Sequence, residues 1–142
     1  MLNKEEIKKV IPHRHEMLLI DKVLEVVPGE SATAELYCKE DSWFFKGHFP
    51  NYPVTPGVLM VEALAQTAAV SFLLLEENKG KIGFFAGINN CKFKKQVKPG
   101  DVLTLKIQTL KSRGAISVVD AKAYVDGKLA VKAELTLAVD NG

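Results

Sequence analysis

Two side chains in this sequence have the types and the spacing for acid–base chemistry: His48 and Glu62. His48 lies in residues 47–57, a stretch whose three prolines and two glycines predict a stiff loop. Glu62 is the one acid in the apolar segment 58–75 and lies close to its start. An imidazole accepts a proton near pH 7, and a carboxyl group can orient or protonate an oxygen atom. We interpret this pair, a histidine on a loop and a lone carboxylate on a buried helix, as a candidate acid–base site.

Each of these residues also has a structural interpretation. A loop histidine taken alone is more often a hydrogen-bonded structural residue. A buried Glu62 would be a structural carboxylate if it paired with His13 or Arg14. An unpaired buried charge is costly, however, and burial next to a histidine favours a working group. Gln66 lies one helical turn beyond Glu62 on the same face, where it either hydrogen-bonds that carboxylate or only packs.

The apolar segment predicts one long helix, from Thr55 to about Asn78. Thr55 is a typical N-cap residue, and Pro56 suits the first turn because it lacks the N–H group that would be unpaired there. Residues 78–80 supply the C-terminal stop. Such a helix would be about 33 Å long. It is apolar on nearly every side, so most of its surface must be covered.

The remainder of the chain predicts β-structure around this helix, with one short helix at the start. Alternating apolar and polar residues, separated by turn signals such as Pro28-Gly29 and Asp126-Gly127, define the strands. We expect the first two strands to form an antiparallel hairpin. The predicted elements are a helix at 3–10 with Asn3 as its N-cap, and strands at 17–27, 31–38, 82–93, 101–110, 116–125 and 129–139.

These elements predict an α+β fold in which residues 1–142 form one domain, with an antiparallel sheet wrapped around one central helix. The sheet would cover the near side of the helix, and the far side would need a partner. The simplest partner is a second copy of the chain related by a two-fold axis, so we expect a homodimer.

The composition argues against several other classes of protein. A net charge of +2 without a long basic block argues against nucleic-acid binding. Cys38 and Cys91 are far apart in sequence and predict reduced thiols in a cytoplasmic protein. The N-terminus lacks the apolar core of a signal peptide, and segment 58–75 is too short and too polar to favour a membrane span. His13 and His15 have no third ligand at a suggestive spacing, so we expect no metal site.

Three groups of residues carry a resemblance to a known family. They are Pro12-His13-Arg14, Leu18-Leu19-Ile20-Asp21 and Gly47-His48-Phe49-Pro50-x-x-Pro53-x-x-Pro56-Gly57-Val58-Leu59-x-x-Glu62-Ala63-Leu64-Ala65-Gln66. This pattern resembles the (3R)-hydroxyacyl-[acyl carrier protein] dehydratases of bacterial type II fatty acid synthesis, over essentially the whole chain. The resemblance implies the hotdog fold, a long helix wrapped by an antiparallel sheet. The sequence departs from the family at His15 and Glu16, where an aromatic residue and a proline are usual, and this leaves the shape of the entry strand open.

The resemblance also implies a reaction and the residues that perform it. Water would leave a 3-hydroxyacyl thioester to give the trans-2-enoyl thioester, with His48 as the base and Glu62 orienting or protonating the leaving hydroxyl. Backbone N–H groups at the helix start would face the thioester oxygen, aided by the helix dipole. In the family, the histidine and the glutamate of one site come from different subunits. The implied substrate-binding residues are Phe49, Gly57, Val58, Gln66 and Phe84, with Gly57 foremost at the helix start and Phe84 as a candidate gate of the acyl tunnel.

The implied partner is an acyl carrier protein, whose phosphopantetheine arm carries the substrate. No metal or redox cofactor is implied, and the expected location is the cytoplasm. Members of the family are dimers or trimers of dimers. A basic patch would suit an acidic carrier protein, although a lysine-rich strand is often only a solvated one. The candidate patch consists of Lys92, Lys94, Lys95 and Lys98.

Three other functions stay open from the sequence. The nearest is a dehydratase that also isomerises the double bond, although those relatives typically carry an aspartate where this chain has Glu62. A hotdog thioesterase would direct water at the thioester carbonyl and has no need of the loop around His48. A non-catalytic acyl-binding module would have no reason to keep His48 and Glu62 together.

Overall fold

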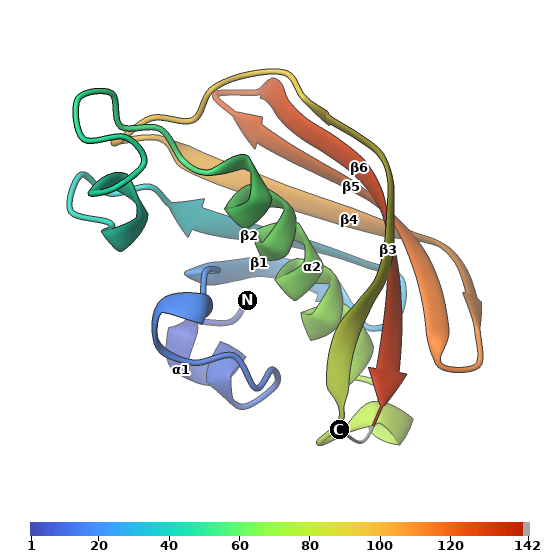
Figure 1. Ribbon diagram of the computed structural model, residues 1–142. Helices are drawn as coiled ribbons and strands as arrows, with labels where there is room; N and C mark the ends of the chain where they lie inside the picture. Colours follow the sequence, from blue (N-terminus) through green and yellow to red (C-terminus); the bar gives the residue numbers. More distant parts are fainter. Residues whose placement is uncertain (141–142) are drawn as a thin grey trace.

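An antiparallel sheet of six strands curves around one long helix in the computed structural model of this protein, which describes residues 1–140 (Figure 1). This architecture is the predicted one, and the last two residues of the predicted domain 1–142 lie outside the described residues. The elements are α1 (Lys4–Lys8), β1 (Lys22–Val27), β2 (Ser31–Tyr37), α2 (Gly57–Leu73), β3 (Ile82–Phe93), β4 (Val102–Arg113), β5 (Ile116–Val125) and β6 (Lys128–Asp140), with 3₁₀ turns η1 (His15–Met17), η2 (Trp43–Phe45) and η3 (Glu76–Asn78).

The strands lie in the order β1-β2-β4-β5-β6-β3, and each neighbouring pair is antiparallel. β1 and β2 form the predicted hairpin. β5 and β6 form another through Asp126 and Gly127, whose φ angles of 50° and 77° are those of a type I′ turn. β3 precedes β4 in the chain, but among the strands that the structure describes it pairs with β6 alone, so β1 and β3 are the two edges of the sheet.

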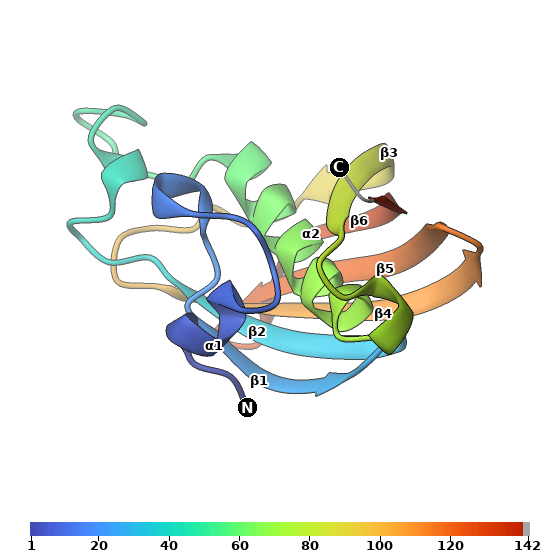
Figure 2. The ribbon, with the colours of Figure 1, turned by 90° about the horizontal axis from the view of Figure 1, so that it is seen from below.

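Alternate residues of the inner strands face the helix. On β4, Leu103, Leu105 and Ile107 are buried, as their alternation with polar residues predicted. β6 continues the same wall of the core, with Val131, Ala133, Leu135 and Leu137 buried. The sheet therefore presents one apolar face, and α2 lies against it (Figure 2).

α2 is buried over almost its whole length, and every residue from Ala63 to Leu73 is buried. The sheet supplies only part of this cover. Ile7, Ile11 and Leu19 of the N-terminal segment belong to the same buried cluster. A second copy of the chain was expected to cover the far side of the helix, whereas the N-terminal segment of the same chain covers part of it.

The helix is shorter than predicted at both ends. Its N-cap is Pro56 rather than Thr55, because the Thr55 N–H donates to the Val97 carbonyl (2.7 Å) and keeps the chain extended up to the proline. The helix ends at Leu73 instead of near Asn78, whose side chain donates to the carbonyl of Phe72 at 3.0 Å. At 17 residues, α2 is about 25 Å long.

The N-terminal segment differs from the prediction in one place. Helix α1 forms within the predicted range, with Asn3 as its N-cap in a capping box with Glu6. The predicted strand 17–27 is a strand only from Lys22 onward. Before it, Met17 lies in a 3₁₀ turn and the N–H of Leu19 donates to a side chain of α2 (3.0 Å) instead of to a neighbouring strand.

Candidate active site

His48 follows η2, in the loop that leads to α2. Its Nδ1 atom lies 3.1 Å from the carbonyl oxygen of Val54, and its ring stacks on that of Phe49 with centroids 4.1 Å apart. A carbonyl oxygen only accepts hydrogen bonds, so Nδ1 carries the proton in this contact. In the neutral ring, Nε2 then holds the lone pair, which is the atom that a base uses.

Hydrogen bonds inside the loop fix the position of His48. The Val54 N–H donates to the His48 carbonyl (2.9 Å), and Phe49 and Tyr52 exchange two backbone bonds of 3.1 and 3.0 Å. The Tyr52 hydroxyl donates to Gln96 at 2.7 Å, which ties the loop to the β3–β4 connection. The stiffness predicted from the prolines is therefore reinforced by this bonding.

The first turn of α2 lies next to His48, and the two border a cavity of about 440 Å³. Among the described residues, the N–H of Gly57 donates to no acceptor, and it lies at the positive end of the helix dipole. A Cβ atom at position 57 would lie 2.7 Å from Cε1 of Phe93, so a side chain there would displace the ring. The residues that line the cavity are His48, Val54, Thr55, Gly57, Met60, Phe93, Lys94, Lys95 and Gln96.

Glu62 lies in the second turn of α2 and has two polar neighbours. Gln66 Nε2 donates to its Oε2 atom at 3.0 Å, as one of the two interpretations of Gln66 predicted. His13 Nε2 lies 3.4 Å from the same oxygen, at ion-pair distance. Glu62 also borders a cavity of about 150 Å³ beside Phe84 and Phe85 of β3.

Within one chain, His48 and Glu62 therefore do not share a cavity. Within the described residues, the polar neighbours of Glu62 are His13 and Gln66, and His48 lies beside the start of α2.

Gln66 is the most strongly bonded of the predicted substrate-binding residues. It is fully buried, its Oε1 accepts from Leu19 N–H (3.0 Å), and its Nε2 donates to the Met17 carbonyl (2.6 Å) as well as to Glu62. Its side chain thus joins α2 to the N-terminal segment.

The other predicted binding residues lie at different places on the surface. Val58 is 75% exposed and does not line the cavity of His48. Phe49 is half exposed on the loop. Phe84 and Phe85 are 46% and 40% exposed, and both border the cavity beside Glu62.

The four lysines of the candidate basic patch have different neighbours. Lys94 and Lys95 line the cavity of His48. Lys98 lies over the ring of Tyr52, 5.8 Å from its centroid. Lys92 lies opposite Lys132 in the β3–β6 pair. Two of the four are therefore close to the predicted base.

Arg14 bonds to the backbone of the N-terminal segment and not to Glu62. Its guanidinium donates to the carbonyls of Ile11 (2.9 Å), His13 (2.8 Å) and Lys8 (2.8 Å). Thr67 bonds back to the carbonyl of Ala63, one turn earlier in α2. The Arg14 bonds hold the N-terminal segment that carries His13, and the Thr67 bond stays within α2.

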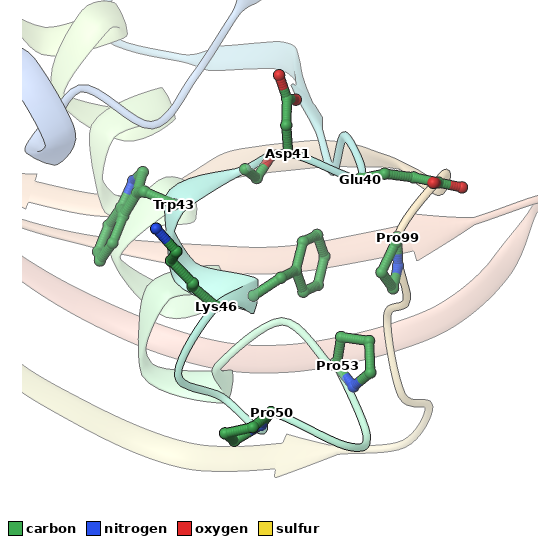
Figure 3. A pocket seen from close by; sticks show the side chains of 9 residues that line it. Glu40, Asp41, Trp43, Lys46, Pro50, Pro53 and Pro99 are labelled. Atoms are coloured by element: carbon green, nitrogen blue, oxygen red, sulfur yellow. The ribbon is translucent and has the colours of Figure 1, made fainter.

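Sequence reasoning missed a larger cavity of about 960 Å³ (Figure 3). Pro50 and Pro53 of the His48 loop and Pro99 of the β3–β4 connection line it, while the carboxylates of Glu40 and Asp41 point outward. It contains neither His48 nor Glu62. The only sequence signal for it is the number of prolines in these two loops, and that signal does not indicate a ligand.

No group of three or more histidine, cysteine or acidic side chains that could hold a metal ion occurs within residues 1–140. None of the helices in that part of the chain is long and apolar enough to cross a membrane.

Comparisons with known proteins point to one family. The family model for the FabA-like domain matches residues 11–134. The chain is 51% identical over 139 residues to the 3-hydroxyacyl-[acyl-carrier-protein] dehydratase FabZ of Oceanobacillus iheyensis, a match that covers 98% of this chain and 99% of that protein. It is 53% identical to the protein of the same name from Bacillus cereus, over 98% of this chain and 96% of that one.

A solved structure has the same fold. It is the dehydratase heterocomplex ApeI:P from Xenorhabdus doucetiae, one chain of which matches with a TM-score of 0.79 at 18% sequence identity. The match covers 93% of this chain and 89% of that chain, so it includes the helix and the sheet around it.

Proposed function

This chain belongs to the FabA-like domain family alongside the FabZ dehydratases, and from that membership we propose that it removes water from 3-hydroxyacyl chains on acyl carrier protein, in fatty acid biosynthesis. The observation that carries the proposal is 51–53% identity, over nearly the full length, to proteins named for that activity. We propose further that the (3R) alcohol is the substrate, the trans-2-enoyl thioester the product, and the cytoplasm the location.

We assign the base to Nε2 of His48. The contact of Nδ1 with the Val54 carbonyl supports this assignment because it leaves the lone pair on Nε2, beside the cavity at the start of α2. Nε2 would take a proton from C2 of the substrate, next to the thioester carbonyl. The negative charge that develops on the thioester oxygen would be stabilised by the free N–H of Gly57 at the helix start.

We propose that Glu62 orients the leaving hydroxyl and assists its protonation. As the C2–H bond breaks, electrons form the C2–C3 double bond and the C3–O bond breaks. The hydroxyl leaves as water and needs one proton, which the His48–Glu62 pair supplies, so in the net reaction the proton removed from C2 balances the one gained by oxygen. This chemistry uses the protein's own side chains and backbone, and the substrate would arrive on the phosphopantetheine arm of the carrier protein.

We propose that the site is completed by a second copy of the chain paired along β3. The outer edge of β3 has no partner strand among the described residues, and Phe84, Phe85, Ile88 and Phe93 are 40–53% exposed on it. A long edge strand with exposed apolar residues favours pairing with another strand. A two-fold axis makes such a pair antiparallel.

This pairing would join the two separate cavities. In an antiparallel pair of β3 strands, the end near Phe93 of one strand lies beside the end near Gly83 of the other. The cavity of His48 includes Phe93, and the cavity of Glu62 includes Gly83. His48 of one copy would thus approach Glu62 of the other, and the dimer would hold two sites.

We also propose that Lys94 and Lys95 meet the carrier protein. Both line the cavity of His48, so an acidic partner held there would direct its acyl chain toward the base.

The experiment that tests the function is hydration of a trans-2-enoyl thioester on acyl carrier protein, the reverse of the proposed reaction. Wild type should form the 3-hydroxyacyl product. We expect His48→Asn, which keeps an amide N–H for the Val54 carbonyl but has no base, to lose about 10²–10⁴-fold in kcat. Glu62→Gln should lose kcat by a similar factor, and both variants should keep the thermal stability of wild type.

Two results would contradict the proposal. Release of free thiol from the thioester would indicate a thioesterase. Tight binding of the acyl thioester without turnover by wild type would indicate a binding module.

A further inference from the structure

The carboxylate of Glu62 has two polar contacts that the proposed reaction does not involve. Oε2 accepts from Gln66 Nε2 at 3.0 Å and lies 3.4 Å from His13 Nε2. Oε1 makes no hydrogen bond with the residues that the structure describes. One oxygen is therefore held from two sides, and the other remains available to a substrate hydroxyl.

His13 is held firmly enough to act on Glu62. The residue before it is Pro12, and the Arg14 guanidinium donates to the carbonyl of His13 itself (2.8 Å) and to that of Ile11 (2.9 Å). Its side chain and that of Glu62 are only 20% and 21% exposed. The imidazole is thus fixed by its backbone and by partial burial.

The surroundings of the His13 ring indicate which of its nitrogens carries the proton. His13 Nδ1 is buried and has no hydrogen-bond partner among the described residues. A proton on Nδ1 would be a buried, unpaired N–H group, which is costly. A proton on Nε2 instead points toward Oε2 of Glu62, so the Nε2–H tautomer fits the site.

We propose that His13 is a positioning residue for Glu62, acting together with Gln66 to hold Oε2 so that Oε1 faces the leaving hydroxyl. This role rests on the proposed function and adds to it a residue that does not touch the reacting atoms. The role requires an N–H donor at the position of Nε2, which a residue that only packs there would not supply.

Three substitutions at one position separate this role from a purely structural one. His13→Gln keeps an amide N–H near the place of Nε2, whereas the shorter His13→Asn places its amide near Nδ1. His13→Phe keeps a ring without a donor. His15→Asn is the matched control, because His15 is exposed two residues away and asparagine tolerates its φ of 57°.

The first readout is hydration of an enoyl thioester, with kcat and KM measured separately. Because misplacing a reacting group by about 1 Å costs up to about 10²-fold, we expect His13→Phe and His13→Asn to lose about 10–10²-fold in kcat with KM unchanged. His13→Gln should stay within about threefold of wild type, and His15→Asn should equal it. Equal losses in the Gln, Asn and Phe variants, in step with a lowered Tm, would overturn the role and leave only packing.

The second readout does not depend on activity. The chain has three histidines, so a spectrum of protein labelled with ¹⁵N-histidine can be assigned by the single substitutions. Glu62→Gln should shift the ring nitrogens of His13 and leave those of His15 in place. An unchanged His13 signal would overturn the contact itself.

The two proposals fail in different ways. An active wild type whose His13→Phe variant is fully active overturns the role of His13 and leaves the proposed function standing. A wild type without hydration activity overturns the proposed function, and the role of His13 in it falls as well.

Discussion

A single buried amide, that of Gln66, connects three parts of the molecule. It accepts from the Leu19 N–H and donates to the Met17 carbonyl and to the Glu62 carboxylate. The main-chain groups it satisfies lie at the end of the 3₁₀ turn η1 and just after it, outside any α-helix or strand. A buried side chain therefore replaces the bonds that regular structure would have supplied.

Replacing Gln66 with leucine should destabilise the protein. The Leu19 N–H and the Met17 carbonyl would lose their partner, and we expect a decrease of about 2–4 kcal/mol in the free energy of unfolding. Urea denaturation measures it. The control is Gln108→Leu at an exposed position, for which we expect less than about 1 kcal/mol. Equal losses of unfolding free energy in the two variants would show that the buried bonds of Gln66 contribute no more to stability than an exposed glutamine does.

The thiol of Cys38 should make stability depend on pH in the alkaline range. Burial raises its pKa from 9.0 to about 11 in the folded protein, although the hydroxyl of Thr55 lowers it in part. Between these values the unfolded chain loses a proton that the folded chain keeps. The free energy of unfolding therefore falls as pH rises from about 9 to about 11.

The expected size of this loss is on the order of 2 kcal/mol. It is measured as the difference between wild type and Cys38→Ala in urea denaturation at several pH values. Below pH 9 the difference should be constant, and above it the wild type should lose stability relative to the variant. A difference that stays constant up to pH 11 would show that the thiol ionises as easily in the folded protein.

At the scale of elements, the start of α2 depends on one close contact with β3. Since a Cβ atom at position 57 would meet the Phe93 ring at 2.7 Å, we expect Gly57→Ala to cost about 1–2 kcal/mol of stability through overpacking. Activity should fall as well, because the displaced ring borders the cavity of His48.

A double-mutant cycle with Phe93→Ala tests the origin of this cost. In the Phe93→Ala background the ring is gone, so Gly57→Ala should cost no stability. Additive effects of the two substitutions would mean that the Phe93 ring is not the cause.

The elements themselves were largely predictable, while their ends were not. The strands 82–93 and 116–125 were predicted with the bounds that the structure has. The second of them lies between two turn signals, Arg113-Gly114 and Asp126-Gly127, and the first begins just after Gly80. The end of α2 was misplaced because Leu74 and Leu75 continue the apolar run although the helix stops at Leu73. The chain from Met17 to Ile20 was predicted as a strand because its residues are typical of one. Its backbone bonds instead to the side chain of Gln66, a tertiary contact that the local sequence does not reveal.

The site was predictable by residue type but not by arrangement. The loop motif and the lone acid identify His48 and Glu62. Sequence spacing does not show which ring nitrogen of His48 bonds the backbone, or that the two residues border different cavities within one chain. His13 lies 49 positions before Glu62 in the chain, and only the folded path of the N-terminal segment brings the two together. Local patterns contain no information on such a contact.

At the scale of the whole molecule, β3 should control both assembly and activity. We expect Ile88→Lys, in the middle of the exposed edge, to place like charges together across a two-fold axis and to produce monomers. The monomer should keep its fold but lose most of its hydration activity. Sedimentation velocity and the enoyl hydration assay give the two readouts.

Leu110→Lys, at an exposed site on β4, is the control and should keep the assembly and activity of wild type. A monomeric Ile88→Lys variant with full activity would show that one chain contains a complete site. A wild type that sediments as a monomer would contradict the pairing itself.

The place of β3 in the sheet also affects how the protein is made. β3 precedes β4 and β5 in the chain, but within residues 1–140 it pairs with β6 alone, which follows them. During synthesis from the N-terminus, both edges of β3 stay open until β6 has left the ribosome. Until then, its apolar residues are available to chaperones or to neighbouring chains, and the surface for a second copy is not yet formed. Assembly should therefore follow completion of the sheet rather than begin on the growing chain.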